Sequence, residues 1–134
     1  MSESGAPSKA PKIVHWVALV FLFLMMAQPT FDNVRGLLNG ALVMGDIRIE
    51  VTFVDMALHL LATVVGWLGW WWFFKRQKRG AYVSIAAHLL GLVATLTQTP
   101  ELLDAIPPAA LGVFFVILLA ATLGPITMFK GEYS

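Results

Sequence analysis

The sequence predicts an all-α integral membrane protein, a single domain built from a bundle of four transmembrane helices. Three observations predict this fold class. Of the 134 residues, 58% are hydrophobic and only 13% are charged, a composition suited to lipid as the solvent. Four apolar stretches are each long enough to cross a bilayer, since about 20 helical residues cover a hydrocarbon core of about 30 Å. The charges between these stretches sort by sign to alternate sides.

Flanking charges and turn residues set the limits of the four spans, which we expect at residues 13–31, 51–74, 81–99 and 109–129. Each span must be helical, because unpaired backbone groups in lipid are costly. The spans belong to one domain, residues 13–134, and residues 1–12 have the composition of a disordered tail. A cleaved signal peptide is the alternative for the first span, but Met25 fits a cleavage site poorly and the apolar run is long for a signal core.

The segment between the first two spans, residues 33–50, predicts an amphipathic outer loop. Apolar residues recur in it at helical spacing, which indicates a short helix on the membrane surface: Leu37, Leu38, Ala41 and Leu42. Residues 47–51 then alternate apolar and charged side chains, as a strand does. We expect this loop to offer a docking surface for a partner.

The distribution of charge predicts the orientation. Seven of the nine basic residues lie on the side that holds both termini, and six of the eight acidic residues lie on the other. The positive-inside rule therefore places both termini in the cytoplasm, and the inner membrane is the expected location in a bacterium. The basic cluster at residues 75–79 follows a Trp-rich helix end, so it indicates contact with lipid headgroups and no nucleic-acid partner.

Polar and small residues share one face on each of the two middle spans. On the second span they are Asp55, His59, Ala62, Thr63 and Gly66, and on the third they are Ser84, Ala87, His88, Gly91, Thr95 and Gln98. Such residues favour close packing of membrane helices. Counted at about 1.5 Å per residue, their depths match within about 2 Å in an antiparallel hairpin. The predicted pairs are Gly66 with Ala87, Ala62 with Gly91, His59 with Thr95, and Asp55 with Gln98.

Two interpretations of this polar hairpin face remain open. In the structural one, Ala62, Gly66, Ala87 and Gly91 pack the helices while His59 bonds Thr95 and His88 bonds a carbonyl group. In the functional one, the intramembrane histidines mark a site, because ionisable residues are rare within lipid. Transport of protons or small ions along Asp55, His59, Thr63 and His88 is one such function. Transporters usually show broken helices and internal repeats, and here the only break within a span is Gly124 with Pro125.

A second functional interpretation comes from short motifs around the three histidines. His15 and Trp16 enter the first span, His59 precedes Gly66 and a basic exit, and Ala87, His88 and Leu89 lie in the third span. In these motifs the chain resembles bacterial b-type cytochromes that hold two haems in a four-helix membrane bundle. The resemblance implies haem b as cofactor and His15, His59 and His88 as its ligands.

The chain departs from that family at the fourth helix, where two further histidine ligands are expected and none follows His88. His15, His88 and His59 lie at depths of about 3, 13 and 24 Å, so no two of them can bind one haem iron within a single copy. A second copy or a partner subunit would have to complete the ligand set.

The sequence carries no catalytic signature. It has no Cys for thiol chemistry and no phosphate loop, metal-binding helix motif or nucleophile elbow. We therefore expect a non-enzymatic accessory or assembly subunit of a larger membrane complex, with no cofactor or metal of its own. Its expected partners are the lipid bilayer and either other membrane subunits or a second copy. A b-haem electron-transfer subunit is the alternative, and ion transport is the third possibility.

Overall fold

The computed structural model of the chain describes residues 9–134, and expectations for residues 1–8 lie outside this range. Its four long helices are α1 (Ala10–Asn39), α2 (Ala57–Phe74), α3 (Lys78–Gln98) and α4 (Pro108–Met128). Two strands, β1 (Ala41–Met44) and β2 (Ile47–Glu50), form a hairpin after α1. Short 3₁₀ turns are η1 (Val54–Met56), η2 (Pro100–Ala105) and η3 (Lys130–Glu132). All four long helices have the length and hydropathy to cross a membrane, which suggests an integral membrane protein.

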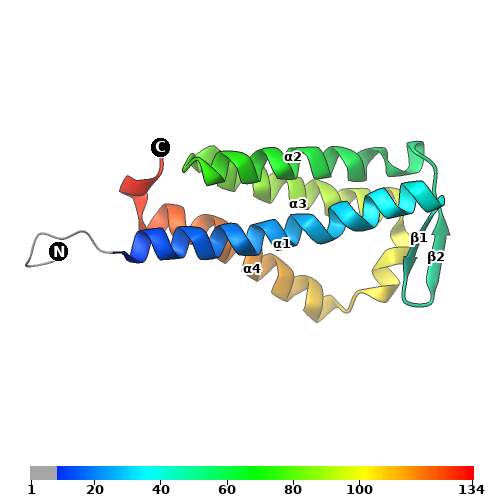
Figure 1. The fold of residues 1–134 in the computed structure, drawn as a ribbon. Helices are drawn as coiled ribbons and strands as arrows, with labels where there is room; N and C mark the ends of the chain where they lie inside the picture. The colour runs from blue at the N-terminus through cyan, green and yellow to red at the C-terminus, as the bar shows by residue number, and fades with distance from the viewer. Residues whose placement is uncertain (1–8) are drawn as a thin grey trace, which may run out of the picture.

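The helices run alongside one another, with the β-hairpin at one end and the two chain ends at the other (Figure 1). We call these the hairpin end and the terminal end. A hydrogen bond of 2.7 Å between His15 Nδ1 and the Tyr133 hydroxyl joins the start of α1 to the residues after α4. Backbone bonds from Lys78 to Ser134 and from Ser134 to Arg76 tie the same residues to the connection between α2 and α3.

Helix α1 is longer than expected at both ends. It begins at Ala10, inside the predicted tail, because Pro11 suits the first helical turn. At the other end it passes Pro29 and the predicted limit at residue 31 and stops only at Gly40, which caps it with a φ of 69°. A charged residue such as Asp32 marks the edge of an apolar run but does not end a helix, whereas a left-handed glycine does.

The chain is mostly helical, as predicted, but residues 41–50 form a β-hairpin. The predicted separate surface helix is wrong, because Leu37 and Leu38 lie in the last part of α1. Ala41 and Leu42 belong to strand β1, whose register pairs Ala41 with Glu50 and Met44 with Ile47. The two-residue turn at Gly45 and Asp46 has the backbone of a tight hairpin, with φ of 58° at Gly45. The alternation over residues 47–51 correctly indicated strand β2.

The hairpin also explains why α2 begins at Ala57 when we expected the span to start at residue 51. The Val51 amide donates to the Gly40 carbonyl at 2.9 Å, which closes the hairpin onto the end of α1. Val51 is buried with Leu42, Met56 and Leu102 in a small core at the hairpin end. Val51 therefore belongs to the core beneath the hairpin.

Helices α2 and α3 pack closely along their whole length. A Cβ atom built at Gly66 would lie 3.5 Å from Ala87 Cβ, and one at Gly91 would lie 4.0 Å from Ala62 Cβ, so these pairs face each other in the expected register. The closest approach lies nearer the terminal end, where a Cβ atom at Gly80 would overlap the backbone of Phe73. Sequence reasoning missed this contact, although Gly69 and Gly80 continue the small-residue faces by one further helical step.

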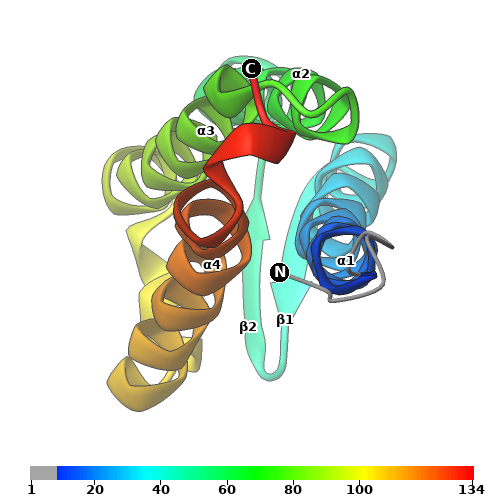
Figure 2. The same ribbon diagram turned by 90° about the vertical axis from the view of Figure 1, so that its left-hand side faces the viewer.

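A larger core lies at the terminal end, where all four helices meet. Its buried residues are Ala18, Leu19, Leu22, Phe73, Ala81, Leu118, Ile126 and Tyr133. From there α4 diverges from the other helices toward Pro108, while the hairpin lies at the far end of α1, beyond the start of α4 (Figure 1 and Figure 2). The two cores therefore hold the ends of the bundle, and a cavity occupies the region between them.

Candidate functional site

The cavity has a volume of about 920 Å³ and is walled by all four long helices, by the hairpin and by η2. Most of its lining is apolar, including Met25, Met26, Leu92, Leu111, Phe114 and Phe115. Phe21, Leu24 and Ile117 also line it and are 39–58% exposed, so the cavity opens sideways between α1 and α4. In a bilayer this opening would face lipid.

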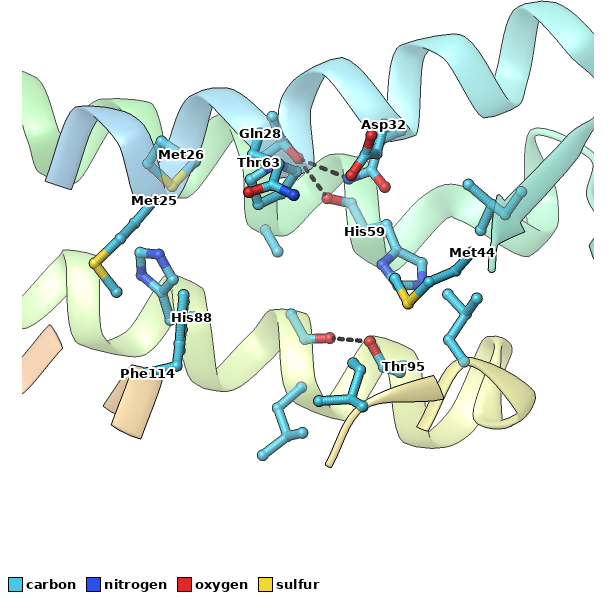
Figure 3. A pocket seen from close by; sticks show the side chains of 18 of the residues that line it. Met25, Met26, Gln28, Asp32, Met44, His59, Thr63, His88, Thr95 and Phe114 are labelled. Carbon is cyan, nitrogen blue, oxygen red and sulfur yellow. Dashed lines mark hydrogen bonds between the residues drawn. The ribbon is translucent and has the colours of Figure 1, made fainter. Parts of the chain in front are cut away.

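His88 lines the cavity, and Figure 3 shows it between Met25 and Phe114. Its Nδ1 atom donates to the Ser84 carbonyl, one turn earlier on α3, at 2.7 Å. Because a carbonyl can only accept, Nδ1 carries the proton, and in the neutral ring Nε2 is then an acceptor. Nε2 is buried and has no partner in hydrogen-bond geometry, although the Met25 backbone lies near the ring. The His88 ring thus lines the cavity, while its Nε2 atom is covered by protein atoms.

His59 also lines the cavity, but its ring is already bonded. Its Nε2 atom lies 3.0 Å from the Thr99 hydroxyl, just past the end of α3. The predicted partner, Thr95, instead donates to the Gly91 carbonyl at 3.0 Å, as Figure 3 shows. Sequence reasoning missed Thr99 because the chain leaves the helix there, and depth counting along α3 does not reach a residue in the following turn.

Thr63 connects the cavity wall to α1. Its hydroxyl donates to the His59 carbonyl at 2.9 Å and accepts from the Asn33 amide at 3.3 Å. A second polar link between the same helices joins the Trp67 indole nitrogen to the Thr30 hydroxyl at 2.9 Å. These bonds hold α1 against α2 beside the cavity, which is a structural role.

Asp55 and Gln98 do not pair as expected. The Asp55 carboxylate accepts from the Thr52 amide at 2.8 Å and from the Thr52 hydroxyl at 3.0 Å, which is a local turn before α2. Gln98 accepts from the Leu58 amide at 3.1 Å and donates to the Val54 carbonyl at 3.3 Å. Gln98 therefore satisfies backbone groups at the start of α2. Asp55 does not line the cavity that His59, Thr63 and His88 share.

His15 lies outside the cavity, in the core at the terminal end. It is 2% exposed, bonds the Tyr133 hydroxyl and stacks on Phe73 with ring centroids 5.3 Å apart. No partner for His15 could be predicted from depth along the spans, because Tyr133 follows the last span and reaches His15 only when the chain turns back through η3. The three histidines thus have three separate environments.

Polar residues gather where the cavity meets the hairpin end. This rim consists of Gln28, Asp32, Asn33, Arg35, Asn39 and Arg48. Sequence reasoning used Asp32, Arg35 and Arg48 only to orient the chain, because their meeting depends on the hairpin. The cavity therefore combines an apolar body with the His88 ring in its wall and a charged rim, the distribution expected of a site for an amphipathic small molecule.

Comparison with models of protein families, with characterised proteins and with solved structures finds no match to this chain. The functional argument consequently rests on the geometry described above.

Proposed function

We propose that this protein is a non-enzymatic membrane subunit that holds an amphipathic small molecule in the cavity between α1 and α4, with both termini in the cytoplasm. The observation that carries the proposal is the cavity itself, with the unpartnered His88 Nε2 in its wall. In a bacterium the protein would lie in the inner membrane, as an accessory or assembly component of a larger complex.

The lateral opening supports an occupied cavity. Because the cavity opens sideways between α1 and α4, it is continuous with the surroundings of the protein and is not an enclosed void. In a bilayer its apolar walls would contact lipid chains or a molecule that enters from the bilayer.

The chemistry of the walls selects among those molecules. Acyl or isoprenoid chains match the Met, Leu and Phe side chains of the wall. Binding there removes the chains from water and gives them van der Waals contact with these side chains, and both effects are favourable. His88 Nε2 is covered by protein atoms, and a rotation of the ring that exposed it to the cavity would let a hydroxyl or N–H group on the ligand donate to it. Burying that nitrogen without a partner costs about 1–3 kcal/mol. A ligand with an apolar body and at least one hydrogen-bond donor fits better than plain lipid chains.

The remaining polar groups support a binding role over catalysis. His59, Thr63 and Gln98 each bond to neighbouring helices, and Asp55 belongs to a local turn. Exposed apolar side chains cover the outer faces of the helices, which suits contact with lipid and with partner helices.

A matched pair of glycine variants tests ligand binding. Gly91 lines the cavity and has only Ala62 near its missing side chain, so Gly91→Leu would fill part of the cavity. Gly112→Leu places the same side chain where no atom lies within 4 Å. After purification in mild detergent, native mass spectrometry should find a bound molecule in the natural protein and in Gly112→Leu, and much less of it in Gly91→Leu. Equal retention in both variants would contradict the proposal.

Cysteine labelling tests the orientation, because the natural chain has no Cys. Asp46→Cys in the hairpin turn should react with an impermeant maleimide added to intact cells. Gly131→Cys at the terminal end should react only after the cells are opened. The reverse pattern would place the termini outside.

A b-haem ligand is the second candidate, and His88 is the observation that favours it. Metal-bound histidines typically donate their other ring nitrogen to a carbonyl or carboxylate group, as His88 does to Ser84. A second axial ligand does not come from His59, whose Nε2 bonds Thr99, or from His15, which lies in another core. One chain could thus supply only one histidine ligand to a haem iron, His88. Another chain would have to supply the second ligand. An oxidised-minus-reduced spectrum with a haem band that disappears in His88→Ala would support this candidate over a lipid.

A further inference from the structure

We infer that the ligand in the cavity carries a phosphate group, held at the hairpin end by Arg35 and Arg48. This inference rests on the proposed function and names the chemical class of the ligand. The corresponding molecule is a phosphate-bearing membrane lipid whose chain occupies the cavity.

The two arginines reach the rim from different elements. Arg35 lies in the last part of α1 and Arg48 in β2, and both line the cavity. Val43, the cross-strand partner of Arg48, also lines it, so residues of this strand pair border the opening. Folding of the hairpin back onto α1 therefore makes two arginines that are 13 positions apart in the sequence border the same cavity.

Neither arginine is neutralised by an ion pair. The acids nearest along the chain are Asp32, one turn before Arg35, and Asp46 and Glu50, each two residues from Arg48. Within residues 9–134 the single ion pair is that of Arg76 with Glu132, at the terminal end. Of the charged residues that line the cavity, two are basic and one, Asp32, is acidic. The rim therefore has a net positive charge.

The position of the rim matches the headgroup level of a bilayer. Residues 13–31 of α1 carry no charge, and Asp32 and Arg35 are the first charged residues after this apolar run. A lipid with its chain along the apolar wall would place its phosphate at this level. Guanidinium groups bind phosphate through paired, charge-assisted hydrogen bonds, and two of them form a preferred site for it. An uncharged lipid alcohol would leave both arginines unpaired.

Three probes separate the parts of this inference: dodecyl phosphate, dodecanol with the same chain, and inorganic phosphate. We expect the purified protein, freed of endogenous ligand, to bind dodecyl phosphate at least about tenfold more tightly than dodecanol, because hydrogen bonds to charged groups contribute about 1.5–3 kcal/mol. Inorganic phosphate alone should bind much more weakly than dodecyl phosphate, since it lacks the chain. Binding is measured by titration calorimetry in a nonionic detergent.

Charge variants identify the residues responsible. Arg35→Gln combined with Arg48→Gln should remove the preference for dodecyl phosphate and leave dodecanol binding unchanged. Lys12→Gln removes an exposed charge at the opposite end of α1 and should keep the preference. Both arginines are exposed, and unchanged thermal unfolding would show that the double variant is folded.

The outcomes distinguish this inference from the proposed function. Equal binding of dodecanol and dodecyl phosphate to the natural protein would overturn the phosphate site while the cavity still binds an amphiphile. Inorganic phosphate that binds as tightly as dodecyl phosphate would overturn a lipid source. If neither chain-bearing probe binds, both the phosphate site and the proposed function fail.

Discussion

The roles of the three histidines differ with the hydrogen-bond partners of their rings. His15 and His59 each bond a hydroxyl group, from Tyr133 and Thr99 respectively, and these bonds tie distant parts of the chain together. His88 bonds only within its own helix and leaves Nε2 buried without a partner. The sequence placed all three in membrane spans, but only their partners separate two structural residues from one available for a ligand.

Replacing His88 with Phe tests this distinction. The ring keeps a similar volume but loses the acceptor, so we expect retention of the bound molecule to fall about two- to tenfold, the usual range for one hydrogen bond. Thermal stability of the ligand-free protein should change little, since the variant loses the Nδ1 bond to the Ser84 carbonyl but also removes a buried nitrogen that has no partner. Native mass spectrometry and thermal unfolding in detergent measure the two effects.

The matched control is His15→Phe. It leaves the buried Tyr133 hydroxyl without a partner, which should destabilise the protein by about 1–3 kcal/mol and leave ligand retention unchanged. If His15→Phe releases the ligand while His88→Phe does not, the assignment of roles is wrong.

Tyr133 should also show a distinct pH dependence. Burial raises its pKa above the ordinary value of 10.0, with Arg76 opposing and Glu132 reinforcing the shift. A pKa that is higher in the folded state means that Tyr133 stabilises the fold fully below pH 10 and that this contribution is lost as the pH rises through the folded-state pKa.

A spectrophotometric titration can observe Tyr133 alone. The chain has two tyrosines, so Tyr82→Phe leaves Tyr133 as the only one. We expect its phenolate band to appear only above pH 10, together with loosening of the core at the terminal end. Ionisation of Tyr133 at or below its ordinary pKa would show that the η3 segment does not pack as described.

At the scale of elements, features that follow helical periodicity, such as the facing pairs of α2 and α3, could be predicted from the sequence. Features that depend on a turn, such as the hairpin and the end of α1, could not. The facing pairs of α2 and α3 follow from depth counting, because both helices are straight and a three-residue connection fixes their register. Strand β1 was missed because residues 41–44 show no alternation of apolar and polar side chains. The spacing of Leu37, Leu38, Ala41 and Leu42 is also that of a helix. The length of α1 was misjudged because charge, unlike Gly40, is not a stop signal.

The tight contact between α2 and α3 predicts a sharp effect at one glycine. Gly80→Ala would place a Cβ atom against the Phe73 backbone and 2.7 Å from the Gly69 carbonyl oxygen, and backbone cannot move aside as a side chain can. We expect a loss of about 2 kcal/mol or more, as overpacking gives elsewhere. Thermal unfolding in detergent measures it.

Gly112→Ala is the control, because a Cβ atom there has no neighbour within 4 Å. Its stability should be unchanged or slightly raised, since Ala is the better helix former. Equal behaviour of the two variants would contradict the close approach of α2 and α3.

For the whole molecule, the defining feature is that α4 diverges from the other helices, which pack together, and leaves a cavity between two cores. The core around Leu22 and Leu118 holds the terminal end, and the core around Met56 and Leu102 holds the hairpin end. The sequence indicated four spans and a polar face but could not predict the cavity. Its volume depends on the divergence of α4 and on the hairpin that folds back onto α1, and neither leaves a periodic signal in the chain.

Site-specific photocrosslinking tests the central claim, an occupied cavity, most directly. A diazirine amino acid at position 111 would lie in the cavity wall, and one at position 113 would lie on the exposed side of α4, where Val113 is 58% exposed. After illumination in native membranes, mass analysis should find one defined amphipathic adduct at Leu111 and a mixture of bulk lipids at Val113. The same mixture at both positions, or adducts at Val113 alone, would contradict the account.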